Sequence, residues 1–204
     1  MQYKVTAFVL GAIDNNVYVV EKDGKCLVID PTYDTAFTVD KYIRQNNLKL
    51  QGVLLTHGHF DHCGGALYFQ KQGVDVYLNE KDVILSRYAA QNYWNIPCEN
   101  VTPNKFYTEG VNTVGDFTFE VVFTPGHTAG GVCLIFDNLL FSGDTLFHNS
   151  IGRTDFPGGD DVNMQSSLRK IAAMSDNLVI CPGHGEYGMT LGDEKKSNQY
   201  LIVL

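Results

Sequence analysis

Positive charge is scarce in this sequence, because 15 Lys and Arg residues stand against 23 Asp and Glu residues, for a formal net charge of −8. Proteins bind nucleic acids mainly through Lys and Arg side chains that neutralise phosphates, so this balance disfavours a DNA or RNA partner. No apolar run approaches the ~18 residues that a membrane span needs. The amino-terminal segment also lacks the architecture of a signal peptide. We therefore expect a cytoplasmic protein with neither a nucleic-acid nor a membrane partner.

The sequence also lacks any CxxC pair, and its five cysteines are widely scattered. Nothing therefore predicts a disulfide framework. Cys26, Cys133 and Cys181 lie within apolar runs and are expected to be small buried core residues. Cys63 adjoins a group of histidines, where a reactive thiol is one interpretation. Because no dedicated base lies beside it, a bystander role is favoured.

No Pro/Ser-rich linker, low-complexity tract or fixed-period repeat interrupts the chain, so we expect residues 1–204 to form a single domain. Runs of β-branched and aromatic residues predict strands at residues 3–10, 15–22, 25–30, 51–56, 74–79, 116–124, 131–137, 138–143 and 177–183. Helical patterns alternate with them at residues 34–47, 61–72, 79–93, 160–174 and 193–201. This interleaving predicts a layered α/β domain with mixed sheets inside and helices outside.

Two short turns predict how some of these strands pair. Asp23-Gly24 and Asp137-Asn138 each lie between strongly patterned strands. Such dipeptides are typical of tight hairpin turns. We therefore expect the strands on either side of each turn to be antiparallel.

Half of the six histidines lie in one short stretch, "THGHFDH", directly after a predicted buried strand. A solvated loop with ordinary titrating groups is one interpretation of such a cluster. However, His127 in "PGHT" and His184 in "PGHG" also follow a strand and a glycine, and Asp144 follows a strand in "SGDTLF". Imidazole and carboxylate groups are ligands for zinc and related divalent ions. Four strand-end loops that each carry such donors therefore predict a metal site, with room for two adjacent ions.

These elements resemble the metallo-β-lactamase superfamily. "THGHFDH" matches its HxHxDH signature, and "PGHT", "SGDTLF" and "PGHG" match its further metal-binding motifs in the same chain order. The resemblance covers nearly all of the chain. It implies an αββα sandwich, with two mixed β-sheets flanked by helices and the site at one edge of the sheets.

The resemblance implies a ligand set of two groups that share one residue. One metal would be held by His57, His59 and His127, and Asp144 would bridge the two metals. The second metal would be held by Asp61, His62 and His184. Two divalent ions roughly 3.5–4 Å apart can share a water and lower its pKa toward ~7, so hydrolysis would need no serine or cysteine nucleophile. Zinc is the expected metal, with iron or manganese as alternatives, and Asp61 and Asp144 are the expected catalytic carboxylates.

The loop "FHNSIGRTDF" after Asp144 contains three further polar candidates. His148 is expected to hydrogen-bond a neighbour, because the ligand set is complete without it. Arg153 and Asp155 form a local ion pair in one interpretation. In the other, Arg153 contacts an anionic group of the substrate through its planar guanidinium.

Within the superfamily, "SIGRTDFPGG" and "PGHGEYGMTLGDEKKSNQYL" resemble short members of the glyoxalase II, or hydroxyacylglutathione hydrolase, group. That resemblance implies a small-molecule thioester substrate of the S-lactoylglutathione type. Longer members have a helical carboxyl-terminal domain that contributes to glutathione binding, for which this sequence shows no equivalent. Three alternatives stay open: a lactonase, an iron-dependent persulfide dioxygenase that uses two histidines and one carboxylate, and a non-enzymatic metal-binding module. The sequence predicts no oligomeric state.

Overall fold

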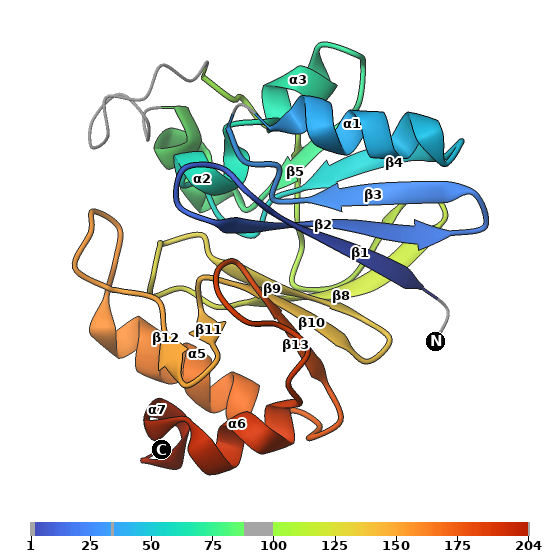
Figure 1. Cartoon of the computed structure of the whole chain (residues 1–204). Helices are drawn as coiled ribbons and strands as arrows, with labels where there is room; N and C mark the ends of the chain where they lie inside the picture. The colour runs from blue at the N-terminus through green and yellow to red at the C-terminus, as the bar shows by residue number, and fades with distance from the viewer. Residues whose placement is uncertain (1–2, 34, 88–99, 204) are drawn as a thin grey trace.

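The protein is a sandwich of two β-sheets with helices on both outer faces, as the computed structural model shows for residues 3–33, 35–87 and 100–203 (Figure 1). The first sheet has six strands in the order β1-β2-β3-β4-β5-β6, and the second has five in the order β13-β10-β9-β8-β7. The first sheet contains β1 (Lys4–Leu10), β2 (Asn15–Lys22), β3 (Lys25–Ile29), β4 (Lys49–Leu54), β5 (Val76–Leu78) and β6 (Lys105–Phe106). The second contains β7 (Gly110–Val114), β8 (Phe117–Phe123), β9 (Val132–Phe136), β10 (Leu139–Gly143) and β13 (Val179–Pro182).

Both predicted hairpin turns are confirmed. Strands β2 and β3 pair antiparallel around Asp23 and Gly24, whose φ angles are 49° and 72°. Two consecutive positive φ values are what a tight two-residue hairpin turn requires, and Gly adopts them without a steric cost. Strands β9 and β10 also pair antiparallel, and Asp137 in their turn has a φ of 51°.

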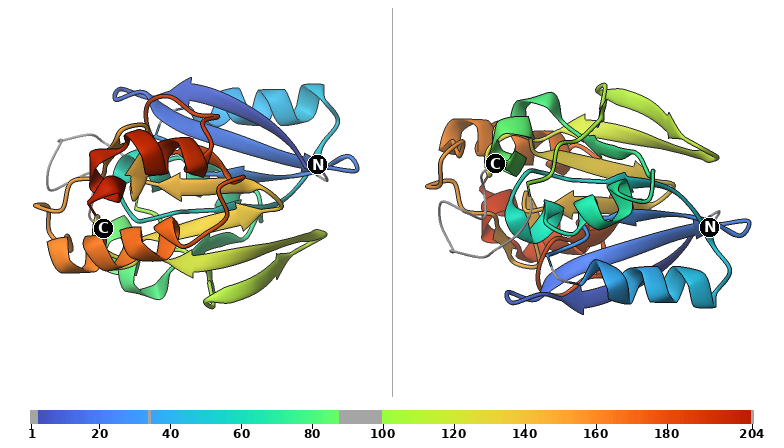
Figure 2. Two further views of the ribbon diagram at one scale, coloured as in Figure 1. Left: turned by 90° about the horizontal axis from the view of Figure 1, so that it is seen from below. Right: turned by 90° about the horizontal axis from the view of Figure 1, so that it is seen from above.

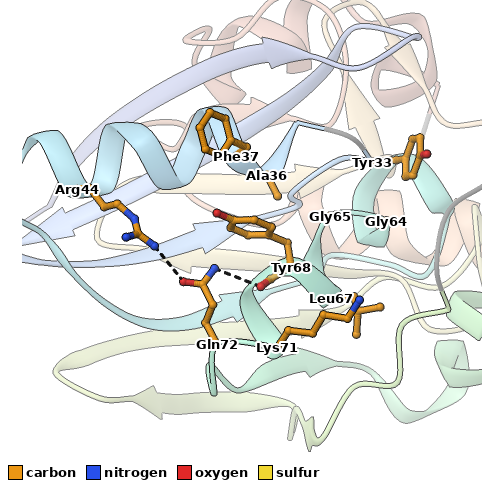
Figure 3. Close-up of a pocket in the computed structure, with 10 residues that line it drawn as sticks. All are labelled: Tyr33, Ala36, Phe37, Arg44, Gly64, Gly65, Leu67, Tyr68, Lys71 and Gln72. Atoms are coloured by element: carbon orange, nitrogen blue, oxygen red, sulfur yellow. Dashed lines mark hydrogen bonds between the residues drawn. The ribbon is translucent and has the colours of Figure 1, made fainter.

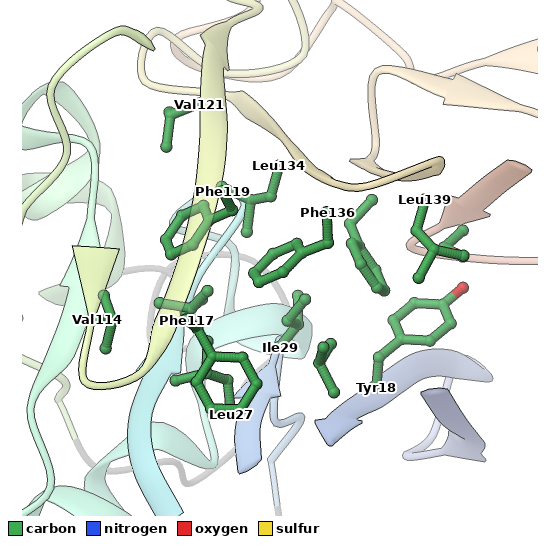
Figure 4. Close-up of a cluster of buried hydrophobic side chains, with 14 of the residues drawn as sticks. Tyr18, Leu27, Ile29, Val114, Phe117, Phe119, Val121, Leu134, Phe136 and Leu139 are labelled. Atoms are coloured by element: carbon green, nitrogen blue, oxygen red, sulfur yellow. The ribbon is translucent and has the colours of Figure 1, made fainter. Parts of the chain in front are cut away.

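Aromatic side chains fill the core between the two sheets (Figure 4). Strand β8 alternates buried and exposed residues along most of its length, so one of its faces packs inward. The ring of Phe136 stacks on that of Phe119 with centroids 4.6 Å apart, and Phe136 meets Tyr3 and Phe141 edge-on. These contacts hold the sheets together face to face.

The helices cover the two outer faces of the sandwich (Figure 2). On the first sheet lie α1 (Ala36–Gln45) and α3 (Ala66–Gln70), which bury Val39, Ile43 and Phe69 against it. On the second lie α5 (Asp161–Ala172), α6 (Leu191–Ser197) and α7 (Gln199–Ile202). The expected αββα fold is thereby confirmed. The expectation that residues 1–204 form a single domain stays a prediction.

Two predicted helices are each broken into two. The helix expected at 61–72 consists of α2 (Phe60–Cys63) and α3, because Gly65 between them donates its N–H to the carbonyl of Pro31. The helix expected at 193–201 is α6 and α7. Asn198 between them has extended ψ, and its side chain accepts a hydrogen bond from the amide of Tyr200 as an N-cap.

The other predicted elements lie where the patterns placed them, with a few additions. The helix expected at 79–93 begins with a 3₁₀ turn, Glu80–Asp82, and continues as helix through 87, and its remainder lies outside the described residues. The short strands β6, β7, β11 (Leu146–Phe147) and β12 (Ser150–Ile151) were not predicted. Two-residue strands such as β11 are too short to produce a periodic pattern.

Four cysteines lie within the described residues; all four are buried, and none of them forms a disulfide there. Burial raises the pKa of the Cys26 and Cys181 thiols to about 12 and that of Cys133 to about 11. These three are inert core residues, as expected. Cys98 lies outside the described residues. Of the helices in the described ranges, none is both long and apolar enough to cross a bilayer.

Candidate metal centre

Four loops that carry the predicted donors meet at one end of the sandwich, where α2 and the β11–β12 hairpin also lie (Figure 1). In the second sheet, β10 is parallel to β13 and antiparallel to β9, which in turn is antiparallel to β8. The carboxyl ends of β8, β10 and β13 therefore share one edge. The fourth loop follows strand β4 of the first sheet and lies at the same end of the sandwich. The loops contribute the seven predicted donors His57, His59, Asp61, His62, His127, Asp144 and His184.

The first donor group is a triangle of imidazole nitrogens from His57, His59 and His127. His59 Nδ1 lies 3.0 Å from His57 Nε2 and 2.9 Å from His127 Nε2. His127 Nδ1 donates to the carbonyl of Arg153 at 2.7 Å, and His57 Nδ1 donates to Thr56 Oγ1 at 3.1 Å. Both Nε2 atoms of the neutral rings therefore carry lone pairs. Since His59 can satisfy only one of them with a proton, a cation between the three nitrogens fits this geometry better than hydrogen bonds.

The second donor group consists of Asp61, His62 and His184. Asp61 Oδ2 lies 3.0 Å from His184 Nε2 and 3.2 Å from His62 Nε2. Each ring is oriented by an acceptor on its far side. His62 Nδ1 lies 2.9 Å from Asp30 Oδ2, and His184 Nδ1 donates to the carbonyl of Ile13 at 3.1 Å. These partners aim both Nε2 atoms at the site, as the outer partners of metal-binding histidines commonly do.

Asp144 lies between the two groups. Its Oδ1 is 3.3 Å from His62 Nε2, and its Oδ2 is 3.4 Å from His127 Nε2 and 3.7 Å from His184 Nε2. His62 Nε2 and Asp144 Oδ1 lie close to each other, but both atoms are buried and neither has a hydrogen-bond partner. Orphaned buried polar atoms are costly unless something fills the space between them. Their chemistry and their convergence fit divalent cations, with His and Asp as ligands.

Burial and mutual proximity set the charge states of these groups. Burial lowers the pKa of His57 well below its ordinary value and that of His59 to about 4. Burial opposes ionisation of Asp61 and Asp144, but the neighbouring His62 prevails, so the pKa of Asp61 is well below its ordinary value and that of Asp144 is about 2. Burial opposes protonation of His62 and His184, but the neighbouring carboxylates Asp61 and Asp144 prevail, so the pKa of each ring lies above its ordinary value. Metals bind neutral imidazoles and ionised carboxylates, so His62 and His184 would release a proton when a metal binds.

Two buried carboxylates that the sequence did not single out support the donor loops. Asp30 accepts hydrogen bonds from the amide and hydroxyl of Thr56 at 2.7 and 2.6 Å, as well as facing His62. Asp82 accepts from the amides of Gly58 and Gly130 at 3.0 and 2.6 Å, which joins two of the loops. Asp30 follows a buried strand in the same way as Asp144 does. Its position after a strand could therefore have identified it from the sequence as a candidate site residue.

A cavity of about 190 Å³ opens onto the donor groups. Its wall includes Ile13, Leu85 and Phe156, so it is apolar opposite the donors. Arg153 also lines it, and its guanidinium forms a two-pronged ion pair with Asp155, with both N–O distances at 2.6 Å. The local ion pair is thus present, while a contact of Arg153 with substrate stays a prediction.

A larger hollow of about 680 Å³ lies between α1 and α3 (Figure 3). Arg44, Gln72 and Tyr68 form a hydrogen-bonded chain along its wall. No histidine, cysteine or carboxylate is among the described residues that line it. The hollow therefore offers no donors for a metal, and the cavity at the histidines is the candidate site.

His148 and Cys63 belong to neither donor group and are not among the metal-binding candidates of the described residues. His148 Nδ1 lies 2.6 Å from the carboxylate of Glu194, so it bonds a neighbour as expected. Cys63 is buried, with its thiol 3.5 Å from the carbonyl of Gly58.

Comparisons with known proteins agree with this geometry. Residues 10–184 match the family model of the metallo-β-lactamase superfamily. Hydroxyacylglutathione hydrolase GloC of Haemophilus influenzae is 35% identical over 201 residues, which cover 93% of this chain and 94% of that protein. The crystal structure of the BLEG-1 B3 metallo-β-lactamase is 32% identical with a TM-score of 0.91, over 97% of this chain and 99% of that one. TTHA1623 in a di-iron-bound form is 32% identical with a TM-score of 0.87, over 96% and 100% of the two chains.

The sandwich and the His/Asp cluster at its edge define a metal-dependent hydrolase that uses divalent ions. The chain belongs to the metallo-β-lactamase superfamily.

Proposed function

We propose that the protein is a dinuclear metallohydrolase that cleaves small acyl thioesters, with S-lactoylglutathione as the first candidate substrate. His57, His59 and His127 would hold one metal, and Asp61, His62 and His184 would hold the other. Asp144 would be shared by both sites, and Asp61 and Asp144 would be the catalytic carboxylates. The observation that carries this proposal is the position of Asp144, whose carboxylate faces a histidine of each group at 3.3–3.4 Å. Zinc is the proposed metal, with iron or manganese as alternatives.

When bound, two divalent cations supply Lewis acidity, which lowers the pKa of a shared water and polarises a substrate carbonyl. The residues of the chain supply the rest of the mechanism. The acceptors behind the rings, Asp30, Ile13 O and Arg153 O, fix the histidines so that no reorganisation is needed during the reaction. Phe156 and Leu85 exclude bulk water from one side of the cavity.

The thioester assignment rests on the similarity to the Haemophilus influenzae hydroxyacylglutathione hydrolase and on the chemistry of the cavity. A volume of about 190 Å³ suits a small acyl group next to the donors, with most of a glutathione outside. A thioester carbonyl is electrophilic and its thiolate is a good leaving group, so polarisation and a nucleophile suffice. Weak contact with the thiol carrier predicts a high KM. A cytoplasmic location is part of this proposal, and the four buried cysteines of the described residues, none of them in a disulfide, are compatible with a reducing compartment.

Cleavage of a β-lactam is a second candidate. It is favoured by the similarity in fold to the BLEG-1 metallo-β-lactamase, with a TM-score of 0.91. A β-lactam carbonyl is also strained and electrophilic, so the same donor groups can act on it.

The test is a panel of substrates on one metal-replete preparation. It comprises S-lactoylglutathione, thioesters of other thiols, simple lactones, a chromogenic cephalosporin, and glutathione persulfide with oxygen consumption as the readout. We expect thioester hydrolysis that a chelator abolishes and added metal restores. Turnover of only a lactone or only the cephalosporin contradicts the thioester assignment. Oxygen consumption with a single iron per chain moves the assignment to a persulfide dioxygenase.

A further inference from the structure

Glu194 on α6 is a fully buried carboxylate that lies against the β11–β12 hairpin. Its Oε1 is 2.6 Å from His148 Nδ1. Its Oε2 accepts hydrogen bonds from the backbone N–H of Asn149 at 2.8 Å and from Asn198 Nδ2 at 3.1 Å. Burial of a carboxylate costs free energy unless several donors satisfy it. Glu194 has three donors, two of them at the turn of one hairpin, which indicates a role there.

The hydrogen-bond pattern defines the state of the hairpin turn. Asn149 Nδ2 lies 2.8 Å from His148 Nε2 and donates to it, so His148 carries its proton on Nδ1 and donates to Glu194. Asn149 has a φ of 55°, which Asn tolerates better than most residues. The carboxylate thus holds both residues at the tip of the hairpin.

Asn198, one turn along from Glu194, holds the strands of the same hairpin. Its Nδ2 is 3.2 Å from the carbonyl of Phe147 in β11 and 3.1 Å from the carbonyl of Ser150 in β12. Glu194 and Asn198 are also joined to each other through side chain and backbone. Glu194 and Asn198 therefore bind both the turn and the strands of the hairpin to the carboxyl-terminal helices.

The hairpin is linked to three of the proposed metal ligands, to His184 by a ring contact and to Asp144 and His127 through the residues that flank it in the chain. Asp144 lies two residues before β11. Two residues after β12 ends at Ile151, the carbonyl of Arg153 accepts from Nδ1 of His127. The ring of Phe147 meets that of His184 edge-on, with centroids 6.2 Å apart. A shift of the hairpin would displace all three.

We propose that Glu194 is a positioning residue for the metal centre, which acts through the β11–β12 hairpin on Asp144, His127 and His184. This inference rests on the proposed metal sites and goes beyond them, because Glu194 is not itself a ligand. Glu194 lies on α6, which packs on the outer face of the second sheet, so a residue outside the donor loops would contribute to metal affinity. Partners behind metal ligands typically change affinity about 10–100-fold when they are lost.

The test measures cobalt(II) affinity and the visible spectrum of the cobalt(II) protein, both without substrate. Glu194→Ala is expected to weaken cobalt(II) binding about 10–100-fold and to alter the spectrum. Glu194→Gln is expected to recover most of the affinity, because its Oε1 can accept from Asn149 while its amide donates to the other tautomer of His148. Glu21→Ala is the matched control, since it removes a carboxylate of the first sheet that accepts hydrogen bonds from Lys4 on β1 and Tyr42 on α1.

A purely structural role predicts a different pattern. In that case Glu194→Ala and Glu21→Ala lower the thermal midpoint but leave cobalt(II) affinity and spectrum unchanged, which overturns the proposal. If Glu194→Ala does not fold, Asn198→Ala is measured in the same way, with unchanged affinity overturning it and weakened affinity supporting it. Since no substrate is present, failure of the thioester assignment is seen separately, as a wild-type protein that binds metal but leaves thioesters intact.

Discussion

Seven side chains from four loops converge on a volume small enough for two ions, and one of them, Asp144, faces both groups. The types and spacing of these donors were visible in the sequence, because HxHxDH places four of them within six positions. Their partners were not. Asp30 reaches Thr56 and His62 across 26 and 32 positions, and such contacts leave no local pattern.

Asp144→Asn is expected to lower both metal content and turnover. The amide keeps the shape of the side chain but removes the anion that balances two cations. Elemental analysis of the purified variant measures the loss. Asp155→Asn is the control for metal content, because it changes an exposed carboxylate nearby that belongs to none of the described donor groups. Full metal content and normal turnover in Asp144→Asn would rule out the bridging role.

Asp30→Asn is expected to weaken metal binding about 10–100-fold while the protein stays folded. The amide offers one acceptor where three hydrogen bonds now end, so the orientation of His62 is lost. Competition with a chelator gives the affinity. Asp40→Asn, a buried carboxylate that bonds Arg44 and Tyr68 on α1 and α3, should leave metal affinity as in the wild type.

Arg153→Gln is expected to raise KM for S-lactoylglutathione with little change in kcat, if its guanidinium contacts the carrier. When a contact stabilises the ground state and the transition state equally, its loss raises KM and leaves kcat unchanged. The neutral thioester of a simple thiol is the matched substrate control and should show no change. An unchanged KM for both substrates would contradict a contact between Arg153 and the thiol carrier.

At the scale of elements, most strands were predictable because large apolar residues mark their buried faces. Strand β8 is an example, because the buried and exposed residues along most of its length match the alternating apolar and polar residues of "FTFEVVF". Strand β7 was not predictable, because Val114 is the one large apolar residue on its inner face. The hairpin of β11 and β12 was not predictable, since its shape depends on Glu194 and Asn198 from helices far along the chain. Gly65 likewise breaks a helical pattern through its bond with Pro31.

The loop between β13 and His184 has no space for a side chain at Gly183. A Cβ at that position would collide with Asp144 Oδ1 and His62 Cε1. Gly183→Ala is therefore expected to abolish metal binding with a smaller effect on the thermal midpoint. Gly73→Ala, in an open turn with a φ of 84°, carries only the conformational cost and should bind metal normally. Normal metal binding in Gly183→Ala would contradict the observed close packing.

At the scale of the whole molecule, two sheets packed by aromatic side chains form a rigid base for the loops (Figure 4). The layers followed from alternating strand and helix patterns, and the resemblance to the superfamily implied their arrangement. Which strand lies beside which, as in the parallel pair β10 and β13, depends on contacts between distant segments, and such contacts leave no local signal in the sequence.

Phe136→Ala is expected to lower the free energy of unfolding by about 3–5 kcal/mol, because the ring is fully buried between the sheets. Urea unfolding of the metal-free protein measures the change. Phe37→Ala removes a ring that is 67% exposed and should be nearly neutral. Equal effects of the two substitutions would mean that the core between the sheets is not as described.

We propose that two metals, held by these seven donors, carry out the hydrolysis. The most direct test is a titration of metal-free protein with zinc while the initial rate of S-lactoylglutathione hydrolysis is followed. We expect the rate to rise to a plateau at two equivalents of zinc per chain, and we expect no restored rate in Asp144→Asn. A plateau at one equivalent, or a wild-type rate in that variant, would rule out a dinuclear mechanism with these donors.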